Sequence, residues 1–370
     1  QRRKLEDPLF YGDYLQLDKL LDCVLPKSRE SGCEAHDEHL FIIIHQVYEL
    51  WFKQILHELG AVVSVFATGS VPEKSMFTIV NRLNRVNEIQ RVLLDQLNVL
   101  ETMSPLDFLD FRDVLFPASG FQSVQFRLLE NTLGLRPQDR LAYGKRGYCS
   151  YLREQEAAVV EKAELGKSVF DHVQDWLERT PFLNLGDFEF WNLYDDAVNR
   201  MLEEDRRTIE CVKEALTASE DVKKEQRKQL EATKKHFQSM LSEEEYNKLL
   251  ARGERRLSYK CLLTSHPLCL HTQDEPIFQL PCKLLHHLVD IDKLMTSWRH
   301  RHSIMVHRML GIKMGTGGSS GFHYLKAAAE RHQVFGDLFN LSTFLIPRYE
   351  LPPLPPHVAK HLHFFSEPAE

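Results

Sequence analysis

Apolar side chains recur at alternating steps of four and three residues over several long stretches, which is the spacing of one face of an α-helix. The longest of these stretches carries the stripe Leu284, Leu288, Ile291, Met295, Trp298, His302, Met305 and Met309. One position of this stripe is a histidine. Because an unsatisfied buried polar group costs about 1–3 kcal/mol, His302 is expected to have either a hydrogen-bond partner or a metal.

An earlier periodic stretch places a second histidine on a buried face. Its stripe is Phe41, His45, Tyr48, Phe52, Ile55 and Leu59. A third stretch, from Ile79 to Leu100, has Arg and Asn residues opposite its apolar face and is expected to be scaffold. His300 and His307 lie off the stripe of the last long helix, so they are expected in solvent or at the rim of a site.

The rest of the chain extends the helical pattern. A short helix is expected from Pro105, followed by a break and a new helix that Ser119 and Gln122 open as a capping box. Residues 192–256 are dominated by Glu, Lys, Gln and Arg, which is typical of the solvated faces of paired helices. No stretch of useful length alternates with the two-residue period of a strand. The sequence therefore predicts an all-α fold, one bundle-like domain over residues 1–370 with a charged helical insertion at 192–256.

Composition narrows the classes of partner. The chain has 46 Lys plus Arg against 53 Asp plus Glu, and this mild net charge of -7 favours neither nucleic acid nor a membrane surface as a partner. No apolar run reaches the roughly 18–20 residues that cross a bilayer, and the first residues lack the apolar segment of a signal peptide, so we expect a cytoplasmic protein. The seven cysteines are scattered without a C-x-x-C pair, which indicates neither a disulfide framework nor a structural zinc site.

Several common site chemistries are excluded by spacing. In GTGGSSG, Ser320 stands where a dinucleotide loop needs its last glycine, and no strand precedes this loop. H-E-x-x-H and G-x-S-x-G are absent, and no histidine has a glutamate three residues before it, which excludes a di-iron carboxylate bundle. Two core histidines on different helices suit a haem, which takes one imidazole as its axial ligand. That both are ordinary core residues remains the alternative, and periodicity does not say which of them would bind iron.

Four longer segments closely resemble the tryptophan 2,3-dioxygenase family of haem enzymes. They are HDEHLFIIIHQVYELWFKQIL (36–56), ETMSPLDFLDFRDVLFPASGFQSVQFRLLE (101–130), ERRLSY (254–259) and DIDKLMTSWRHRHSIMVHRMLGIKMGTGGSSGFHYL (290–325). With YGDYLQLDKLL (11–21) and FNLSTFLIPR (339–348), the resemblance spans nearly the whole chain.

This resemblance implies an all-helical homotetramer, a dimer of dimers, with one haem b in each subunit. The haem is ferrous when active, and O2 is the co-substrate. The implied reaction inserts both atoms of O2 into the C2–C3 bond of L-tryptophan and gives N-formyl-L-kynurenine. This is the first step of tryptophan degradation through the kynurenine pathway.

The resemblance also implies roles for single residues. His302 matches the proximal ligand of the haem iron, and His45 matches the distal histidine, which is expected to bond the indole N–H. Arg112 corresponds to the arginine that grips the substrate carboxylate through two parallel hydrogen bonds, and Thr316 to the residue that contacts the ammonium. The remaining substrate-pocket residues implied by the match are Phe41, Phe108 and Leu115. The remaining haem contacts are Ser119, Gly120, Trp298 and Met305.

An N-terminal segment, residues 1–25, is implied to reach a neighbouring subunit. In the family this segment completes the neighbour's active site, and the matching residues are Tyr11, Tyr14 and Leu15. Oligomerisation would then be part of catalysis.

Two places depart from the family pattern. A proline in a helix interior costs about 3 kcal/mol, so Pro267 predicts that the helix expected over 260–281 breaks or starts later. His300 and Arg301 stand where the family has a tyrosine and an asparagine. Two rival functions follow from the residues, a haem oxygenase of another indoleamine and a haem-free helical scaffold. Comparing the turnover of L-tryptophan with that of tryptamine distinguishes a tryptophan dioxygenase from the first rival. An absorption spectrum distinguishes it from the second, because a haem-free scaffold would show no Soret band.

Overall fold

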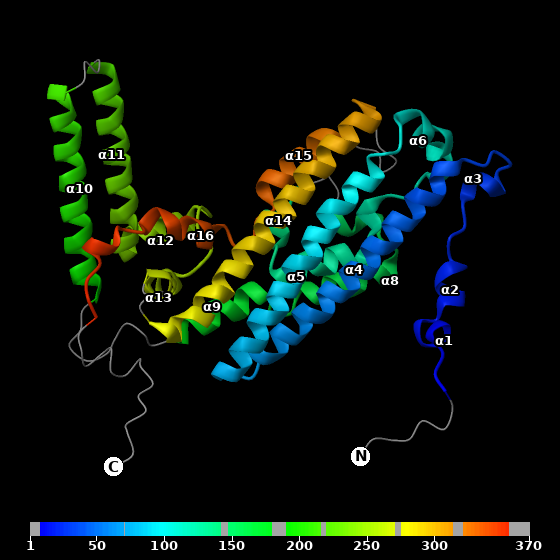
Figure 1. The fold of residues 1–370 in the computed structure, drawn as a ribbon, viewed down its shortest axis with the longest axis horizontal. Helices are drawn as coiled ribbons and strands as arrows, with labels where there is room; N and C mark the ends of the chain where they lie inside the picture. Colours follow the sequence, from blue (N-terminus) through cyan, green and yellow to red (C-terminus); the bar gives the residue numbers. More distant parts are fainter. Residues whose placement is uncertain are drawn as a thin grey trace, which may run out of the picture. The chain divides into compact units, whose positions relative to one another are not determined.

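A computed structural model of the protein describes residues 8–69, 71–141, 147–179, 190–215, 220–270, 275–313 and 321–354. Within these ranges all regular structure is helical, which confirms the predicted all-α fold (Figure 1). No helix in the same ranges combines the length and the apolar character needed to cross a membrane.

The helices follow the periodic stretches of the sequence. The α-helices are α1 (Tyr11–Leu15), α2 (Leu17–Leu21), α3 (Lys27–Glu30), α4 (His36–Phe66), α5 (Glu73–Leu100), α6 (Pro105–Arg112), α7 (Val124–Leu133), α8 (Glu154–Glu164), α9 (Val169–Arg179), α10 (Phe190–Ala215), α11 (Glu220–Leu241), α12 (Glu243–Ala251), α13 (Tyr259–Leu270), α14 (Gln279–Leu310), α15 (Gly321–Arg331) and α16 (Gly336–Phe339). Short 3₁₀ helices cover Asp113–Leu115, Gly120–Gln122, Pro137–Asp139, Tyr148–Tyr151, Pro276–Phe278, Asn340–Phe344 and Arg348–Glu350.

The chain divides into two compact units, which are described separately. The first unit comprises residues 1–57, 88–166 and 294–333, and the second comprises residues 58–87, 167–293 and 334–370. Helices α4, α5 and α14 each contribute residues to both units. The two units are therefore not consecutive pieces of chain, and a single domain over residues 1–370 stays a prediction.

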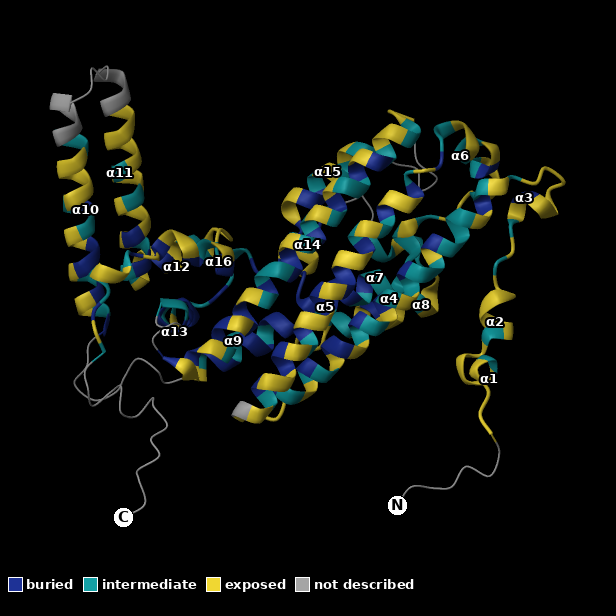
Figure 2. Ribbon diagram, in the orientation of Figure 1, coloured by how far each residue is buried: buried dark blue, intermediate teal, exposed yellow. Residues whose placement is uncertain are grey.

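In the first unit, α4 and α5 pack through their predicted apolar stripes. Tyr48 and Phe52 of α4 and Leu93 and Leu97 of α5 are buried, and the Tyr48 hydroxyl donates a hydrogen bond to the carbonyl of Leu93. Buried and exposed residues alternate along both helices, as expected of amphipathic segments (Figure 2). This pairing holds the His45 side of α4 beside the end of α5.

The segment between α5 and α8 begins with capped turns. Ser104 and Asp107 form a capping box that opens α6. The predicted box of Ser119 and Gln122 is present, but it opens the 3₁₀ helix Gly120–Gln122, and Ser123 caps α7. The box was therefore correctly located, whereas the type of helix it opens was wrong.

Helix α7 ends at a glycine with a left-handed backbone. Gly134 has φ +116°, and its N–H and that of Leu135 both bond the carbonyl of Glu130. A residue with a Cβ rarely adopts this conformation, so the glycine fixes where α7 stops. This end of α7 carries the polar residues that line the site described below.

The charged stretch of the second unit forms helices, as expected. α10, α11 and α12 cover most of residues 192–256. Where their side chains are described, most of the charged ones are exposed, whereas Tyr194, Phe237 and Tyr246 are buried. The Tyr194 hydroxyl donates to the carbonyl of Phe344, and that of Tyr246 donates to the carbonyl of Leu257 at 2.9 Å. These helices are therefore amphipathic: they bury aromatic side chains on one face and are polar on the other.

The helix expected over 260–281 does break, as Pro267 predicted, but the break comes after the proline and not at it. Helix α13 runs from Tyr259 to Leu270 with Pro267 inside its last turn. The proline has no N–H to bond the carbonyl of Leu263, and its ring crowds that carbonyl, which agrees with the end of α13 three residues later. The Ser265 hydroxyl also bonds the carbonyl oxygens of Cys261 and Leu262, at 2.8 and 3.1 Å, and steadies this turn.

Candidate functional site

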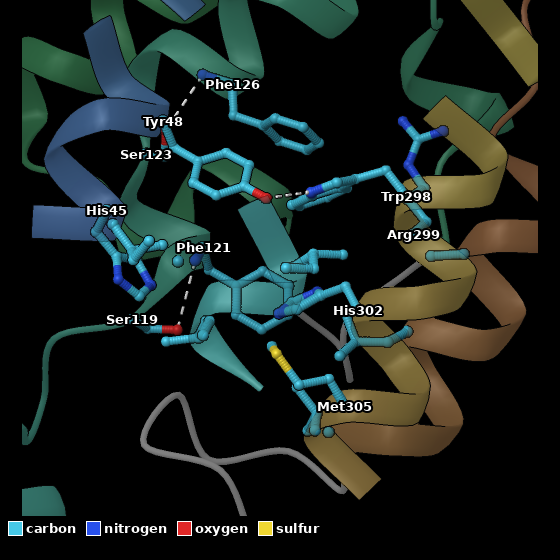
Figure 3. A pocket seen from close by; sticks show the side chains of 18 of the residues that line it. His45, Tyr48, Ser119, Phe121, Ser123, Phe126, Trp298, Arg299, His302 and Met305 are labelled. Carbon is cyan, nitrogen blue, oxygen red and sulfur yellow. Dashed lines mark hydrogen bonds between the residues drawn. The ribbon is translucent and has the colours of Figure 1, made fainter. Parts of the chain in front are cut away.

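A cavity of about 350 Å³ in the first unit brings the two stripe histidines to one place. Its walls come from α4, the end of α5, the segment 103–130, the end of α14, and α15 with the residue that follows it, and they are mostly aromatic and aliphatic. Figure 3 shows His45 on α4 and His302 on α14 entering from different walls. Sites for small molecules and cofactors typically enclose about 300–1,000 Å³ and combine apolar walls with a few polar groups. The cavity has the size and lining of such a site.

His302 presents an uncharged ring to this cavity. Burial, and then the nearby His45, lower the pKa of His302 to about 4, so the imidazole is neutral at pH 7. Its ring stacks on the indole of Trp298, with centroids 5.1 Å apart and planes 19° apart. Neither ring nitrogen forms a hydrogen bond within the part of the chain that the structure describes. A neutral, oriented imidazole with a lone pair is a suitable metal ligand.

Trp298 is itself held in place by α4. Its indole N–H donates to the hydroxyl of Tyr48 at 3.2 Å (Figure 3). The Tyr48 hydroxyl in turn donates a hydrogen bond to the carbonyl of Leu93 on α5. The chain of bonds from α5 through Tyr48 to Trp298 fixes the surface on which the His302 ring lies.

His45 is oriented by its own helix. Its Nδ1 lies 2.7 Å from the carbonyl oxygen of Phe41, and the two rings are 4.1 Å apart. Desolvation by the surrounding protein lowers the pKa of His45, while the bond to Phe41 and the carboxylate of Glu49 oppose that shift. The side chain itself is exposed, so the expectation that His45 lies on a buried face is wrong: α4 turns it toward the cavity and not into a packed core. Glu49 is held by hydrogen bonds from Ser123 and Gln125, at 2.5 and 2.9 Å. The neutral form of His45 therefore faces the cavity.

A buried group of charges lines one part of the cavity. Glu130 is 2% exposed and pairs with Arg127, Arg140 and Arg299 at 3.0, 2.5 and 2.8 Å. Burial alone would raise the pKa of Glu130, but the three guanidinium groups, Arg140 first, outweigh it and hold that pKa well below its usual value. His332 lies against the same carboxylate, with Nδ1 3.9 Å from Oε1 of Glu130.

This charged group has more positive than negative charge. Three arginines surround a single carboxylate, and Arg127 and Arg299 are among the residues that line the cavity. Buried cations without a full complement of anions are costly. The arrangement favours an anionic group of a ligand at this wall.

The structure brings together most of the residues that the sequence indicated. His45, Phe41 and Phe108 line the cavity on the side of α4 and α6, and the remaining predicted lining residues are Ser119, Gly120, Trp298, His302 and Met305. His300 and His307 are exposed, which confirms their assignment to the outside of the site. Arg301, which departs from the family pattern, reaches α5 and bonds Leu94 and Glu101 at 3.2 and 3.0 Å.

Other predicted residues do not line the cavity. Arg112 lies in the last turn of α6, one turn after Phe108, and neither it nor Leu115 is among the lining residues. Tyr11 and Tyr14, on α1, are 75% and 71% exposed. Leu15 is on the same helix and is also exposed. Thr316 lies outside the described residues.

Sequence reasoning missed the charged wall. Arg127 and Glu130 stand three residues apart on α7, and this spacing is a signal for an ion pair. Arg299 gives no such signal because its partner Glu130 is 169 residues away. Tyr48 was assigned only to the core, although its hydroxyl positions Trp298.

Comparison with known proteins gives one consistent result. A sequence profile described as tryptophan 2,3-dioxygenase matches residues 1–345. A protein of that name from Bdellovibrio bacteriovorus is 49% identical over 96% of this chain and 98% of its own length. Similar proteins of the same name are those of Alteromonas mediterranea (44% identical, 99% of this chain and all of its own) and Xenopus tropicalis (46%, 96% and 86%).

Proposed function

Because the chain belongs to the tryptophan 2,3-dioxygenase family, we propose that the cavity between His45 and His302 holds haem b and is the place where L-tryptophan is oxidised. The chain is a tryptophan dioxygenase and catalyses the first step of the kynurenine pathway, which gives N-formyl-L-kynurenine. The observation that carries the proposed site is the pair of neutral imidazoles facing one apolar cavity from two helices.

The residues of the cavity fit a haem. His302 would hold the haem through its iron, since its ring is neutral, is oriented by Trp298, and bonds no described residue through nitrogen. Met305 and the aromatic walls suit the apolar macrocycle. Arg127 and Arg299 would face its two propionate carboxylates, which balances the surplus positive charge around Glu130.

The haem supplies the site at which O2 binds and is activated, and the protein supplies orientation. His45 would accept a hydrogen bond from the indole N–H through Nε2, because Nδ1 already bonds Phe41. Phe41 and Phe108, whose rings are 5.8 Å apart, would wall the indole. Such positioning converts an encounter of two reactants into a reaction within one complex and accounts for much of the rate. The apolar lining also keeps water away from the reacting atoms.

The amino-acid end of the substrate is assigned to Arg112 and Thr316. Arg112 would bind the carboxylate, and Leu115 would extend the wall formed by Phe108. The support is its place on α6, one turn beyond the cavity-lining Phe108. Thr316 would contact the ammonium group, and this part rests on the match of the sequence motif alone.

We further propose that the enzyme is a homotetramer, a dimer of dimers, in which residues 1–25 reach a neighbouring subunit. The support is the exposure of Tyr11, Tyr14 and Leu15 together with Phe10, which is 67% exposed. A run of large apolar side chains on one surface segment is characteristic of a protein contact.

The proposed site is tested by spectroscopy of the purified enzyme. The ferrous protein should bind carbon monoxide and shift its Soret band, and it should convert L-tryptophan and O2 to N-formyl-L-kynurenine. His302→Ala should lose both the normal spectrum and the activity, whereas His300→Ala, at an exposed position on the same helix, should keep both. An unchanged spectrum and rate in His302→Ala would refute the assignment.

A further inference from the structure

Three side chains with soft-metal donor atoms meet in the second unit, and none of them lines the cavity. Cys269 is the next-to-last residue of α13, and Cys282 and His286 stand on the first turns of α14. The Sγ atom of Cys282 lies 3.6 Å from Sγ of Cys269 and 3.7 Å from Nδ1 of His286. All three donor atoms are within 4.8 Å of one another.

These separations are those of the edges of a zinc coordination tetrahedron. Zn–S bonds of about 2.3 Å and Zn–N bonds of about 2.0–2.1 Å, set at the tetrahedral angle, give S–S and S–N edges of about 3.8 and 3.5 Å. The observed 3.6 and 3.7 Å therefore match the two edges that meet at Cys282, and the third edge, between Cys269 and His286, is at most 4.8 Å. A disulfide, by contrast, requires about 2.05 Å between the sulfurs, so they would have to approach by about 1.5 Å. A disulfide would also give no reason for the imidazole of His286 to lie 3.7 Å from Sγ of Cys282.

The helices present the three groups to a common point. Cys282 and His286 are four residues apart on α14, which places both on one face of that helix. Cys269 reaches the same point from the end of α13, whose position in the fold is marked beside the start of α14 in Figure 1. Cys282 is buried, Cys269 is half-buried and His286 is exposed, so the cluster opens to solvent on the side of His286.

We propose that Cys269, Cys282 and His286 bind one zinc ion, which ties the end of α13 to the start of α14. The two cysteines bind as thiolates, and their two protons pass to solvent, while His286 binds as the neutral imidazole. Three protein ligands leave a fourth position for water from the exposed side. The sequence did not reveal this set, because Cys-x12-Cys-x3-His lacks the close cysteine pair of common zinc sites.

The test is the metal content of the holoenzyme. Protein from zinc-supplemented cells, purified without chelator and dialysed, should contain one zinc ion per chain by inductively coupled plasma mass spectrometry. His286→Ala and Cys282→Ser should each bind zinc at least about tenfold more weakly, as expected when a metal ligand is lost. His286 is exposed, so its removal does not disturb a core. The exposed Cys33→Ser and His236→Ala, outside the cluster, are matched controls and should retain zinc.

A second variant separates a lost ligand from a damaged fold. His286→Cys replaces one zinc ligand by another and should keep the ion, with iron content and circular dichroism unchanged in every variant. Wild-type protein that takes up no zinc from micromolar zinc chloride would overturn the proposal. So would zinc that is retained equally in His286→Ala and the controls, or a Cys269–Cys282 disulfide found by peptide mass spectrometry in the zinc-exposed protein.

Discussion

The Nδ1 atom of His45 lies 2.7 Å from the carbonyl oxygen of Phe41, one helical turn earlier in α4. A carbonyl oxygen only accepts hydrogen bonds, so Nδ1 carries the proton of the neutral ring. Desolvation by the surrounding protein lowers the pKa of His45, which favours this neutral ring. Nε2 is then an acceptor, which suits a partner of the indole N–H and does not require the histidine to deprotonate the indole.

His45→Ala should weaken the reaction by about one hydrogen bond. We expect kcat/KM for L-tryptophan to fall by about 2–13-fold, corresponding to about 0.5–1.5 kcal/mol. The N1-methyl derivative has no N–H to donate, so its kcat/KM should fall much less or rise. Steady-state kinetics with both substrates provide the measurement. Equal losses on the two substrates would show that His45 acts in some other way.

Arg112→Ala should cost at least about 2–3 kcal/mol in kcat/KM for L-tryptophan, because the carboxylate would lose its charged partner. The variant should discriminate poorly between L-tryptophan and tryptamine, which lacks the carboxylate. Arg136→Ala, at an arginine that pairs with Asp139 on the surface, is the matched control and should be unaffected. Wild-type preference for L-tryptophan in Arg112→Ala would remove this residue from the site.

The N-terminal segment should connect assembly with activity. Deletion of residues 1–20 is expected to weaken tetramer formation and substrate binding together. The double change Tyr11→Ala and Tyr14→Ala is milder, and it should leave the stability of an isolated chain within about 0.5 kcal/mol because both side chains are exposed. Light scattering and kcat/KM are measured on the same samples. A fully active monomer would contradict the shared site.

Helical periodicity predicted the part of the site that one element determines. His302, His45 and Phe41 line the cavity because they belong to apolar stripes, and a stripe is a property of one helix. The charged wall is different, since Glu130, Arg140 and Arg299 come from three separate segments. Their meeting depends on tertiary packing, which local spacing does not specify.

The same distinction holds for the fold. Ser119 and Gln122 marked a turn correctly, since a capping box is a local arrangement. Pro267 correctly predicted that the helix over 260–281 breaks, but the exact end, three residues after the proline, depends on packing that the sequence does not show. The approach of Cys269 to Cys282 likewise depends on how α13 meets α14.

Glu130→Gln should destabilise the protein by about 3–5 kcal/mol, because it removes the charge that balances buried Arg127, Arg140 and Arg299. Urea denaturation at pH 7 measures the free energy of unfolding. The control is Glu88→Gln on α5, where a largely exposed glutamate pairs with Arg91, and it should change stability by less than about 1 kcal/mol. If both variants lost the same free energy of unfolding, the buried ion pairs of Glu130 would contribute no more to stability than the exposed pair of Glu88.

His332 should make the protein less stable in mild acid. Its Nε2 accepts the backbone N–H of Leu141 at 3.0 Å, a bond that a protonated ring cannot make. Burial, against the opposing charge of Glu130 and with the help of the neighbouring arginines, Arg299 first, lowers the pKa of His332 from 6.5 to about 4.

Between pH 6.5 and about 4 the unfolded chain therefore binds a proton at this histidine that the folded chain does not, so stability falls as the pH falls. The loss attributable to His332 should be about 3 kcal/mol across this window and absent above pH 7.5. His332→Gln keeps an acceptor for the Leu141 N–H but does not titrate, so its free energy of unfolding should depend less on pH. Parallel curves for the two proteins between pH 6.5 and 4.5 would show that His332 stays accessible to protons in the folded state.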